Sequence, residues 1–163
     1  MMKGPYQAIA DYMHRRILEN LNEVAGRVES KGMSPIEGIF FAALWNISEL
    51  ESPFGCPVVG FEPQEGQLAI LGQARIEKFR VDFMVTVRTA NGKEYKRLVV
   101  ECDGHDFHER TKKQAKNDRS RDRRLQELGY TIYRFTGSEI YTNPVKCAQD
   151  VLRWADAAAG FPL

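Results

Sequence analysis

The hydrophobic positions follow a helical period near both ends of the chain and a strand-like pattern in the middle. The segments with a helical pattern are 6–30, 34–50, 111–128 and 144–159. The short segments rich in β-branched and aromatic residues are 67–76, 79–88, 94–102 and 130–135. This order predicts α-α-β-β-β-α-β-α, which is typical of an α/β fold with a mixed sheet flanked by helices.

The ends of these elements carry recognisable start and turn residues. Ser34 followed by Pro35 and Glu37 predicts a helix start, with an N-cap, a proline at the first helical position and an acid three residues after the cap. Asn91-Gly92 is a strong signal for a tight β-hairpin. Because neither a linker nor an internal repeat divides the chain, we expect a single domain over residues 1–163.

The composition is that of an ordinary globular protein. Hydrophobic residues make up 43% and charged residues 28% of the chain, which argues against disorder. No apolar run approaches the roughly 18 residues that a membrane span needs, and the N-terminus lacks the apolar core of a signal peptide. The three cysteines are widely spaced, which indicates reduced thiols rather than a disulfide framework. We therefore expect a cytoplasmic protein without a membrane partner.

The positive charge is concentrated in one segment. The whole chain has a net charge of +1, but residues 110–124 contain eight basic and two acidic residues, a net charge of +6. A basic segment on an otherwise acidic protein indicates a polyanionic partner. A solvated helix face has the same composition, so the charge pattern alone leaves both interpretations open.

Three acids come together if the hairpin has the expected register. A two-residue loop at Asn91-Gly92 places Asp82 opposite Glu101, with their Cβ atoms roughly 4.5–5.5 Å apart. Asp103 then lies on the same face. Opposed like charges destabilise a sheet unless basic side chains such as Arg80 or a divalent cation neutralise them, and Mg²⁺ prefers carboxylate oxygens. A set of strand-end carboxylates that face solvent is the alternative.

Two histidines follow the acids. His105 and His108 could exchange protons near neutral pH beside the carboxylates. Together with Cys102 they could instead bind zinc, although the chain offers no fourth ligand at a suitable spacing and Cys102 is expected to face the core.

The basic helix also has an unusual apolar face. Asp118 and Asp122 share the helix face of Leu125, so these two acids need partners near the sheet. Arg121 and Arg134 are candidates, either as support for the acidic site or as a structural clamp.

These residues together resemble the PD-(D/E)XK, or restriction-endonuclease-like, nuclease superfamily. Its layout is an acid on a helix, an aspartate on a strand and a Glu-x-x group at the end of the paired strand. The matching residues here are Glu37, Val81-Asp82 and Glu101-Cys102-Asp103.

A closer similarity is to bacterial endonuclease-like domains related to very-short-patch-repair endonucleases. The additional matching positions are Gln73, Ile76, Phe79, Arg80, Phe83, Val100, Gly104, Arg121-Asp122, Gly129-Tyr130 and Arg134-Phe135. The resemblance is strongest over residues 34–140, and the helices at 6–30 and 144–159 are additions to it.

The resemblance implies a metal-dependent DNA endonuclease that hydrolyses phosphodiester bonds. It implies that Asp82 and Glu101 hold Mg²⁺ or Mn²⁺ and that Asp103 or His108 orients or deprotonates the attacking water. The supporting residues would be Glu37, Gln73, His105, Lys113 and Lys116. The DNA-binding residues would be Lys112, Lys113, Lys116 and Arg119.

Two positions depart from the superfamily pattern. Val81 replaces a proline, and Asp103 stands where a lysine is usual, so the role of that lysine falls to Asp103 or to Lys113 or Lys116 of the next helix. A non-cleaving nucleic-acid- or partner-binding module on the same fold is the alternative function. The intact acids Asp82, Glu101 and Asp103 argue against it.

Overall fold

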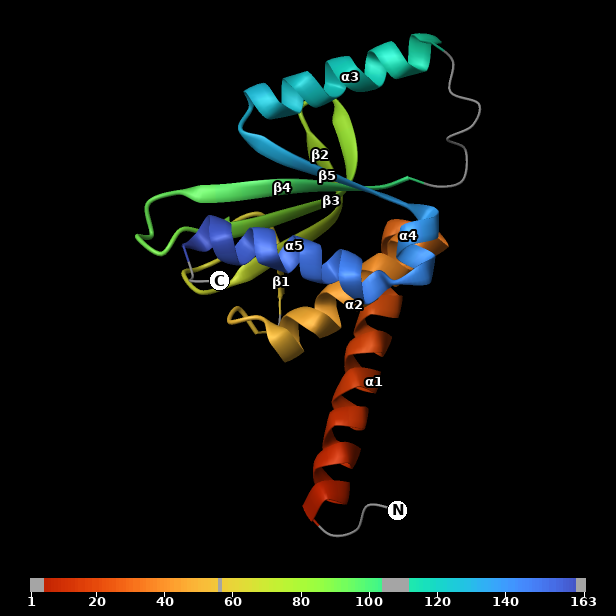
Figure 1. The fold of residues 1–163 in the computed structure, drawn as a ribbon, viewed down its shortest axis with the longest axis vertical. Helices are drawn as coiled ribbons and strands as arrows, with labels where there is room; N and C mark the ends of the chain where they lie inside the picture. Colours follow the sequence, from red (N-terminus) through yellow and green to blue (C-terminus); the bar gives the residue numbers. More distant parts are fainter. Residues whose placement is uncertain (1–4, 56, 104–111, 161–163) are drawn as a thin grey trace.

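A five-stranded mixed sheet lies between helices on both of its faces (Figure 1). The computed structural model describes residues 5–55, 57–103 and 112–160, with side chains from residue 7 and, after the gap at 104–111, from residue 116. The helices are α1 (Pro5–Lys31), α2 (Pro35–Glu51), α3 (Lys112–Glu127), α4 (Gly137–Thr142) and α5 (Pro144–Ala159). The strands are β1 (Val58–Val59), β2 (Leu68–Ile76), β3 (Phe79–Arg88), β4 (Tyr95–Asp103) and β5 (Tyr130–Thr136).

The strands lie in the order β1-β2-β3-β4-β5. β2, β3 and β4 pair antiparallel, while β1 pairs with β2 and β5 pairs with β4 in parallel. This confirms the predicted α/β class and the order of the predicted elements. The two additional elements, β1 and α4, are too short to show a period in the sequence. α4 is marked instead by a capping box between Thr136 and Glu139.

The β3–β4 hairpin has the predicted register but a wider loop. Residues 83–88 pair with residues 95–100 in the alignment centred on Asn91-Gly92. A two-residue type I′ loop needs a positive φ at both central residues, and of these two only the glycine has one, at 65°. The Thr89 carbonyl accepts from the glycine N–H at 2.7 Å, and the Thr89 N–H donates to the Glu94 carbonyl at 2.9 Å. Because the loop widens equally on both sides, the register is preserved.

α2 and α5 cover the first face of the sheet around a cluster of aromatic rings. The ring of Phe83 on β3 lies 5.3 Å from that of Phe40 and 5.7 Å from that of Phe41, measured between centroids. α5 adds an apolar stripe that includes Val151 and Ala155. This packing holds β3 and β4 in place and buries the side chains that face α2.

α3 covers the second face near the turn between β2 and β3. Its buried Leu125 packs against apolar residues of both strands. The neighbouring Arg124 pairs with Glu77 of the turn at 2.5 Å. These contacts set the position of α3 across the strands that carry the candidate acids.

β2 and β3 change face where they approach α3. Phe83 lies in the aromatic cluster of the first face, whereas Val81 and Ala74 lie in the cluster under α3, although strict alternation would put Val81 beside Phe83. The regular pairing of β2 with β3 skips Gln73 and Asp82 at this point, and Gln73 has a φ of 53°. The hairpin end therefore turns toward α3, as Figure 1 shows.

α1 is longer than the helix against which it packs. It has 27 residues and α2 has 17, a difference that corresponds to about 15 Å of helix. Val24 is buried, and Arg16 pairs with Glu49 of α2 at 2.7 Å, whereas Ile9 and Tyr12 are 58% and 65% exposed. Only part of the predicted apolar stripe is therefore covered.

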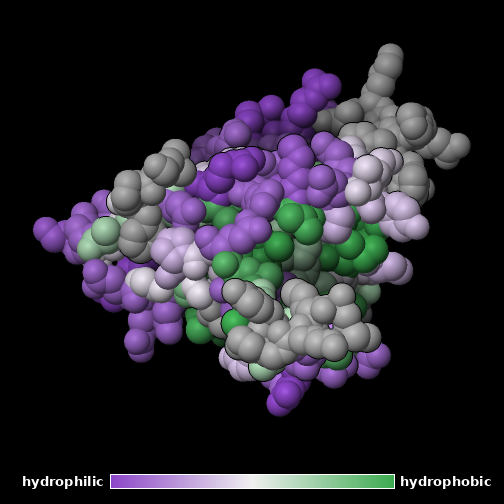
Figure 2. All heavy atoms as spheres, turned by 60° about the horizontal axis from the view of Figure 1, so that its bottom comes forward, coloured by the Kyte–Doolittle hydropathy of each residue, from purple (hydrophilic) through white to green (hydrophobic). Residues whose placement is uncertain are grey.

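Figure 2 looks toward the end of the molecule from which α1 projects and shows apolar side chains in the middle of this face, with polar side chains around them. Within the part of the chain that the structure describes, none of the helices has the length and hydropathy to cross a membrane.

Candidate active site

Asp82 lies where β3 separates from β4. The regular pairing of the two strands ends at Phe83 and Val100, one pair before Asp82 would meet Glu101. Asp82 Oδ2 instead accepts a hydrogen bond from the backbone N–H of Cys102 at 2.7 Å. The carboxylate therefore takes the place of a backbone carbonyl at the end of the ladder and links β3 to β4.

Glu101 is a buried carboxylate on β4, with 7% of the residue exposed. Its Oε1 atom accepts from Nη2 of Arg121 on α3 at 2.5 Å. Burial raises the pKa of Glu101 to about 7, because desolvation disfavours the charged form; Arg121 opposes this rise and the charge of Asp82 adds to it. Glu101 and Asp82 therefore influence each other, as the hairpin register predicts.

Further acids add to the same concentration of negative charge. Burial raises the pKa of Asp82; the hydrogen bond from Cys102 opposes this, and the charges of Glu37 and Asp103 reinforce it. Burial and the same carboxylates, together with Glu101, raise the pKa of the Cys102 thiol. The structure thus brings four predicted acids together around the end of β4.

Cys102 itself faces the aromatic core, as the sequence predicts. The thiol is buried among apolar side chains, whereas a zinc site needs its ligands grouped around the ion. The zinc alternative is therefore disfavoured at this ligand.

Glu37 joins the cluster from the first turn of α2. Ser34 Oγ donates to Glu37 Oε1 at 2.8 Å and accepts from the Glu37 N–H at 3.3 Å, which confirms the predicted helix start. Glu37 Oε2 accepts from Gln73 Nε2, and Gln73 Oε1 accepts from Arg80 Nε. Glu37 is therefore a capping residue that also begins a chain of hydrogen bonds ending at Arg80.

The conformation of Gln73 gives a first testable prediction. We expect the Gln73→Gly variant to be more stable than Gln73→Ala by about 1 kcal/mol, because only alanine must hold a Cβ in the left-handed region. Both variants lose the amide that links Glu37 to Arg80. Urea unfolding of both proteins measures the difference.

The control pair for this experiment is Leu71→Gly and Leu71→Ala, two residues earlier on β2. At a strand position with a negative φ, the glycine variant is expected to be less stable than the alanine variant. If Gln73→Gly is also the less stable member of its pair, the left-handed backbone at Gln73 does not exist in solution.

α3 supplies a second set of ion pairs. Asp122 Oδ1 accepts from Arg134 Nη2 of β5 at 2.5 Å, and Arg134 Nη1 lies 3.9 Å from Asp103 Oδ2. The predicted pairing of Asp122 with Arg134 is confirmed. The contact of Arg121 with Glu101 was not anticipated, although a signal existed: Arg121 precedes the buried Leu125 by four residues, so both face the sheet.

The remaining predicted residues are described in part or not at all. Lys116 and Arg119 are exposed on α3. For Lys112 and Lys113 only the backbone is described, and His105 and His108 lie outside the described residues. Their roles stay predictions.

The acidic cluster fits a hard divalent cation by its chemistry. Its groups are carboxylates whose pKa values are raised by burial and by one another, so their charged forms are incompletely stabilised in the cation-free protein, and a divalent cation would stabilise them. Asp82 and Glu101 are the residues that would hold the cation. Within residues 5–55, 57–103 and 112–160, no three His, Cys, Asp or Glu side chains are already arranged as a metal site.

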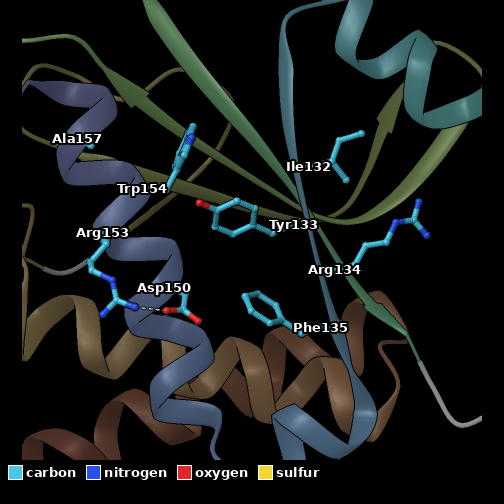
Figure 3. A pocket seen from close by; sticks show the side chains of 8 residues that line it. All are labelled: Ile132, Tyr133, Arg134, Phe135, Asp150, Arg153, Trp154 and Ala157. Carbon is cyan, nitrogen blue, oxygen red and sulfur yellow. Dashed lines mark hydrogen bonds and ion pairs between the residues drawn. The ribbon is translucent and has the colours of Figure 1, made fainter. Parts of the chain in front are cut away.

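A separate hollow of about 660 Å³ lies between the edge strand β5 and α5 (Figure 3). Tyr133 and Phe135 point toward α5, where Trp154 lies, while Arg134 points to the opposite side of β5. The carboxylates of Asp82 and Glu101 do not line this hollow. The hollow and the acidic cluster are therefore different features, and Arg134 belongs to both.

A mixed sheet with carboxylates at the point where two antiparallel strands separate is the arrangement expected of a restriction-endonuclease-like protein. The sequence model of the restriction-endonuclease-like family REase_MTES_1575 matches residues 64–154, more than half of the chain. The chain belongs to this family of nuclease domains. The matched region includes Asp82, Glu101 and Arg121 but not Glu37. Comparisons with curated proteins and with solved structures find no match.

Proposed function

We propose that the protein is a metal-dependent DNA endonuclease. The observation that carries this proposal is the pair of desolvated, mutually repelling carboxylates Asp82 and Glu101 on neighbouring strands of a restriction-endonuclease-like domain. Such charges are costly in the folded protein unless a cation or a basic group neutralises them. A local arrangement that costs stability is expected where function requires it.

Each acid has a proposed part in the reaction. Asp82 and Glu101 would hold Mg²⁺ or Mn²⁺, which when bound would lower the pKa of a water molecule and neutralise charge on the scissile phosphate. Asp103, which lies 3.9 Å from Arg134, would orient or deprotonate the water. The family resemblance implies the same role for His108, which stays a prediction.

α3 would carry the contacts to the DNA backbone. Its basic residues would neutralise phosphates on either side of the cleaved bond without reading the base sequence. The proposed contact residues are Lys112, Lys113, Lys116 and Arg119. Lys113 or Lys116 is also the candidate for the role of the superfamily lysine.

This arrangement predicts the salt dependence of DNA binding. Lys116→Ala and Arg119→Ala are each expected to weaken binding and to reduce the slope of log Kd against log salt concentration by about 0.9, the contribution of one phosphate contact. Fluorescence anisotropy with a labelled duplex in EDTA measures the slope without cleavage. The control is Lys146→Ala on α5, with an exposed lysine on the other face of the sheet. An unchanged slope in both α3 variants would make these residues part of a solvated helix face.

The proposed activity is tested by incubating the protein with supercoiled plasmid in Mg²⁺ or Mn²⁺. Relaxed circles indicate cleavage of one strand, and linear DNA indicates cleavage of both. We expect product only with the cation and none in excess EDTA.

A non-cleaving binding module on the same fold is the second candidate. Two observations favour it: Asp103 replaces the usual lysine, and Arg121 already neutralises Glu101, as a structural clamp would. That candidate predicts DNA binding with the slope described above but no product with either cation.

A further inference from the structure

Arg121 reaches both strands that carry the candidate metal ligands. Its Nη2 atom donates to Glu101 Oε1 of β4 at 2.5 Å and to the Arg80 carbonyl of β3 at 2.7 Å. The Arg121 side chain is 20% exposed and the Glu101 side chain 9%, so the guanidinium lies on the outer side of the pair. Arg121 therefore neutralises, in the cation-free protein, the carboxylate that a divalent cation would use.

We propose that Arg121 is an internal counter-ion that competes with the divalent cation for Glu101, so that the cation binds only when Arg121 releases this carboxylate. This inference rests on the proposed function, because it takes Asp82 and Glu101 as cation ligands. Arg121 is thus a positioning residue: it holds Glu101 at the end of β4 until the cation takes its place.

The competition follows from charge and space. A guanidinium and a divalent cation on one buried carboxylate repel each other, and this repulsion is strong where little water screens it. The exchange also requires only a local change. After release, Arg121 retains the Arg80 carbonyl as an acceptor, and Leu125 and the Arg124–Glu77 pair continue to hold α3 on the sheet.

The competition sets a measurable change in affinity. When only a fraction of the protein is competent to bind, the apparent affinity falls by that fraction. If the Arg121–Glu101 pair is formed about nine-tenths of the time, cation binding is weakened about tenfold. Removal of the guanidinium should therefore recover this tenfold loss in affinity for the cation.

The experiment is calorimetric titration of the DNA-free protein with Mn²⁺. Arg121→Gln is expected to bind Mn²⁺ about tenfold more tightly than wild type. Arg123→Gln is the matched control, because it removes one positive charge from an exposed position on the same helix. The control should change the Kd by less than about twofold, the effect of an exposed charge that the solvent screens. If Arg121→Gln binds Mn²⁺ no more tightly than Arg123→Gln, or more weakly than wild type, the proposed competition is contradicted.

Two further proteins complete the test. Arg121→Lys keeps a cation that makes fewer hydrogen bonds, so its affinity for Mn²⁺ should lie between those of wild type and Arg121→Gln. If Arg121→Gln does not fold, the inference is overturned when Arg121→Lys binds Mn²⁺ no more tightly than wild type. Asp82→Asn should lose Mn²⁺ binding. If wild type and Asp82→Asn both fail to bind Mn²⁺, the proposed metal site fails, whereas binding in wild type without tightening in Arg121→Gln rejects only the role of Arg121.

Discussion

Asp82→Asn and Glu101→Gln are each expected to abolish cleavage of supercoiled DNA, with a loss of roughly 10³-fold or more. Each substitution keeps the shape of the side chain and removes a negative charge that the cation needs. A bound metal contributes several kcal/mol to stabilising a phosphoryl transition state, and each 1.4 kcal/mol corresponds to a factor of ten in rate. The initial rate of plasmid nicking in Mg²⁺ or Mn²⁺ measures the loss.

The control for this experiment is Glu94→Gln, which removes a carboxylate that is 63% exposed in the loop between β3 and β4. This variant should nick DNA at the wild-type rate. Full activity in Asp82→Asn, or wild-type activity in excess EDTA, would contradict the proposed mechanism. DNA binding should persist in Asp82→Asn, because the proposed phosphate contacts lie on α3.

The cation-free protein should lose stability as the pH rises from about 4.5 to 7. Burial raises the pKa of Glu101 from 4.5 to about 7, so in this window the folded state keeps a proton that the unfolded state releases. Stability therefore decreases with pH until both states are ionised. A pKa difference of this size corresponds to a fall of about 3 kcal/mol in the free energy of unfolding between pH 4 and pH 8.

Glu101→Gln isolates this contribution, because glutamine does not titrate and resembles the protonated acid. Urea unfolding of both proteins in EDTA at a series of pH values gives the comparison. The stability of wild type relative to Glu101→Gln should decrease over the window and remain constant above pH 8. A relative stability that is constant, or that increases with pH, would show that Arg121 outweighs the burial of Glu101.

The local elements were predictable because their signals act over a few residues. Ser34 and Glu37 begin α2 through contacts within one helical turn. The register of β3 and β4 follows from the position of Asn91-Gly92 and from alternation, and it survives the wider loop because both strands lengthen equally. The grouping of Asp82, Glu101 and Asp103 follows from the same register, whereas Glu37 was expected from the family resemblance.

The geometry at the end of the hairpin was not predictable from alternation. Asp82 was expected directly opposite Glu101, yet it bonds the Cys102 N–H after the ladder has ended. The change of face at Gln73 and Asp82 depends on the packing of Val81 under α3 and on the left-handed backbone of Gln73. Neither feature has a local sequence signal, because glutamine rarely adopts this conformation.

Local signals are enough to predict the longer helices and strands, the alignment of β3 with β4 and the grouping of Asp82, Glu101 and Asp103, since these depend on neighbours along the chain or on a single turn. The pairing of each arginine with its acid, in contrast, depends on how the helices pack on the sheet. Arg121 and Glu101 are 20 residues apart, and Asp122 and Arg134 are 12 apart. These pairs exist because Leu125 and the contact of Arg124 with Glu77 set how α3 crosses the sheet, and such packing depends on the whole folded chain.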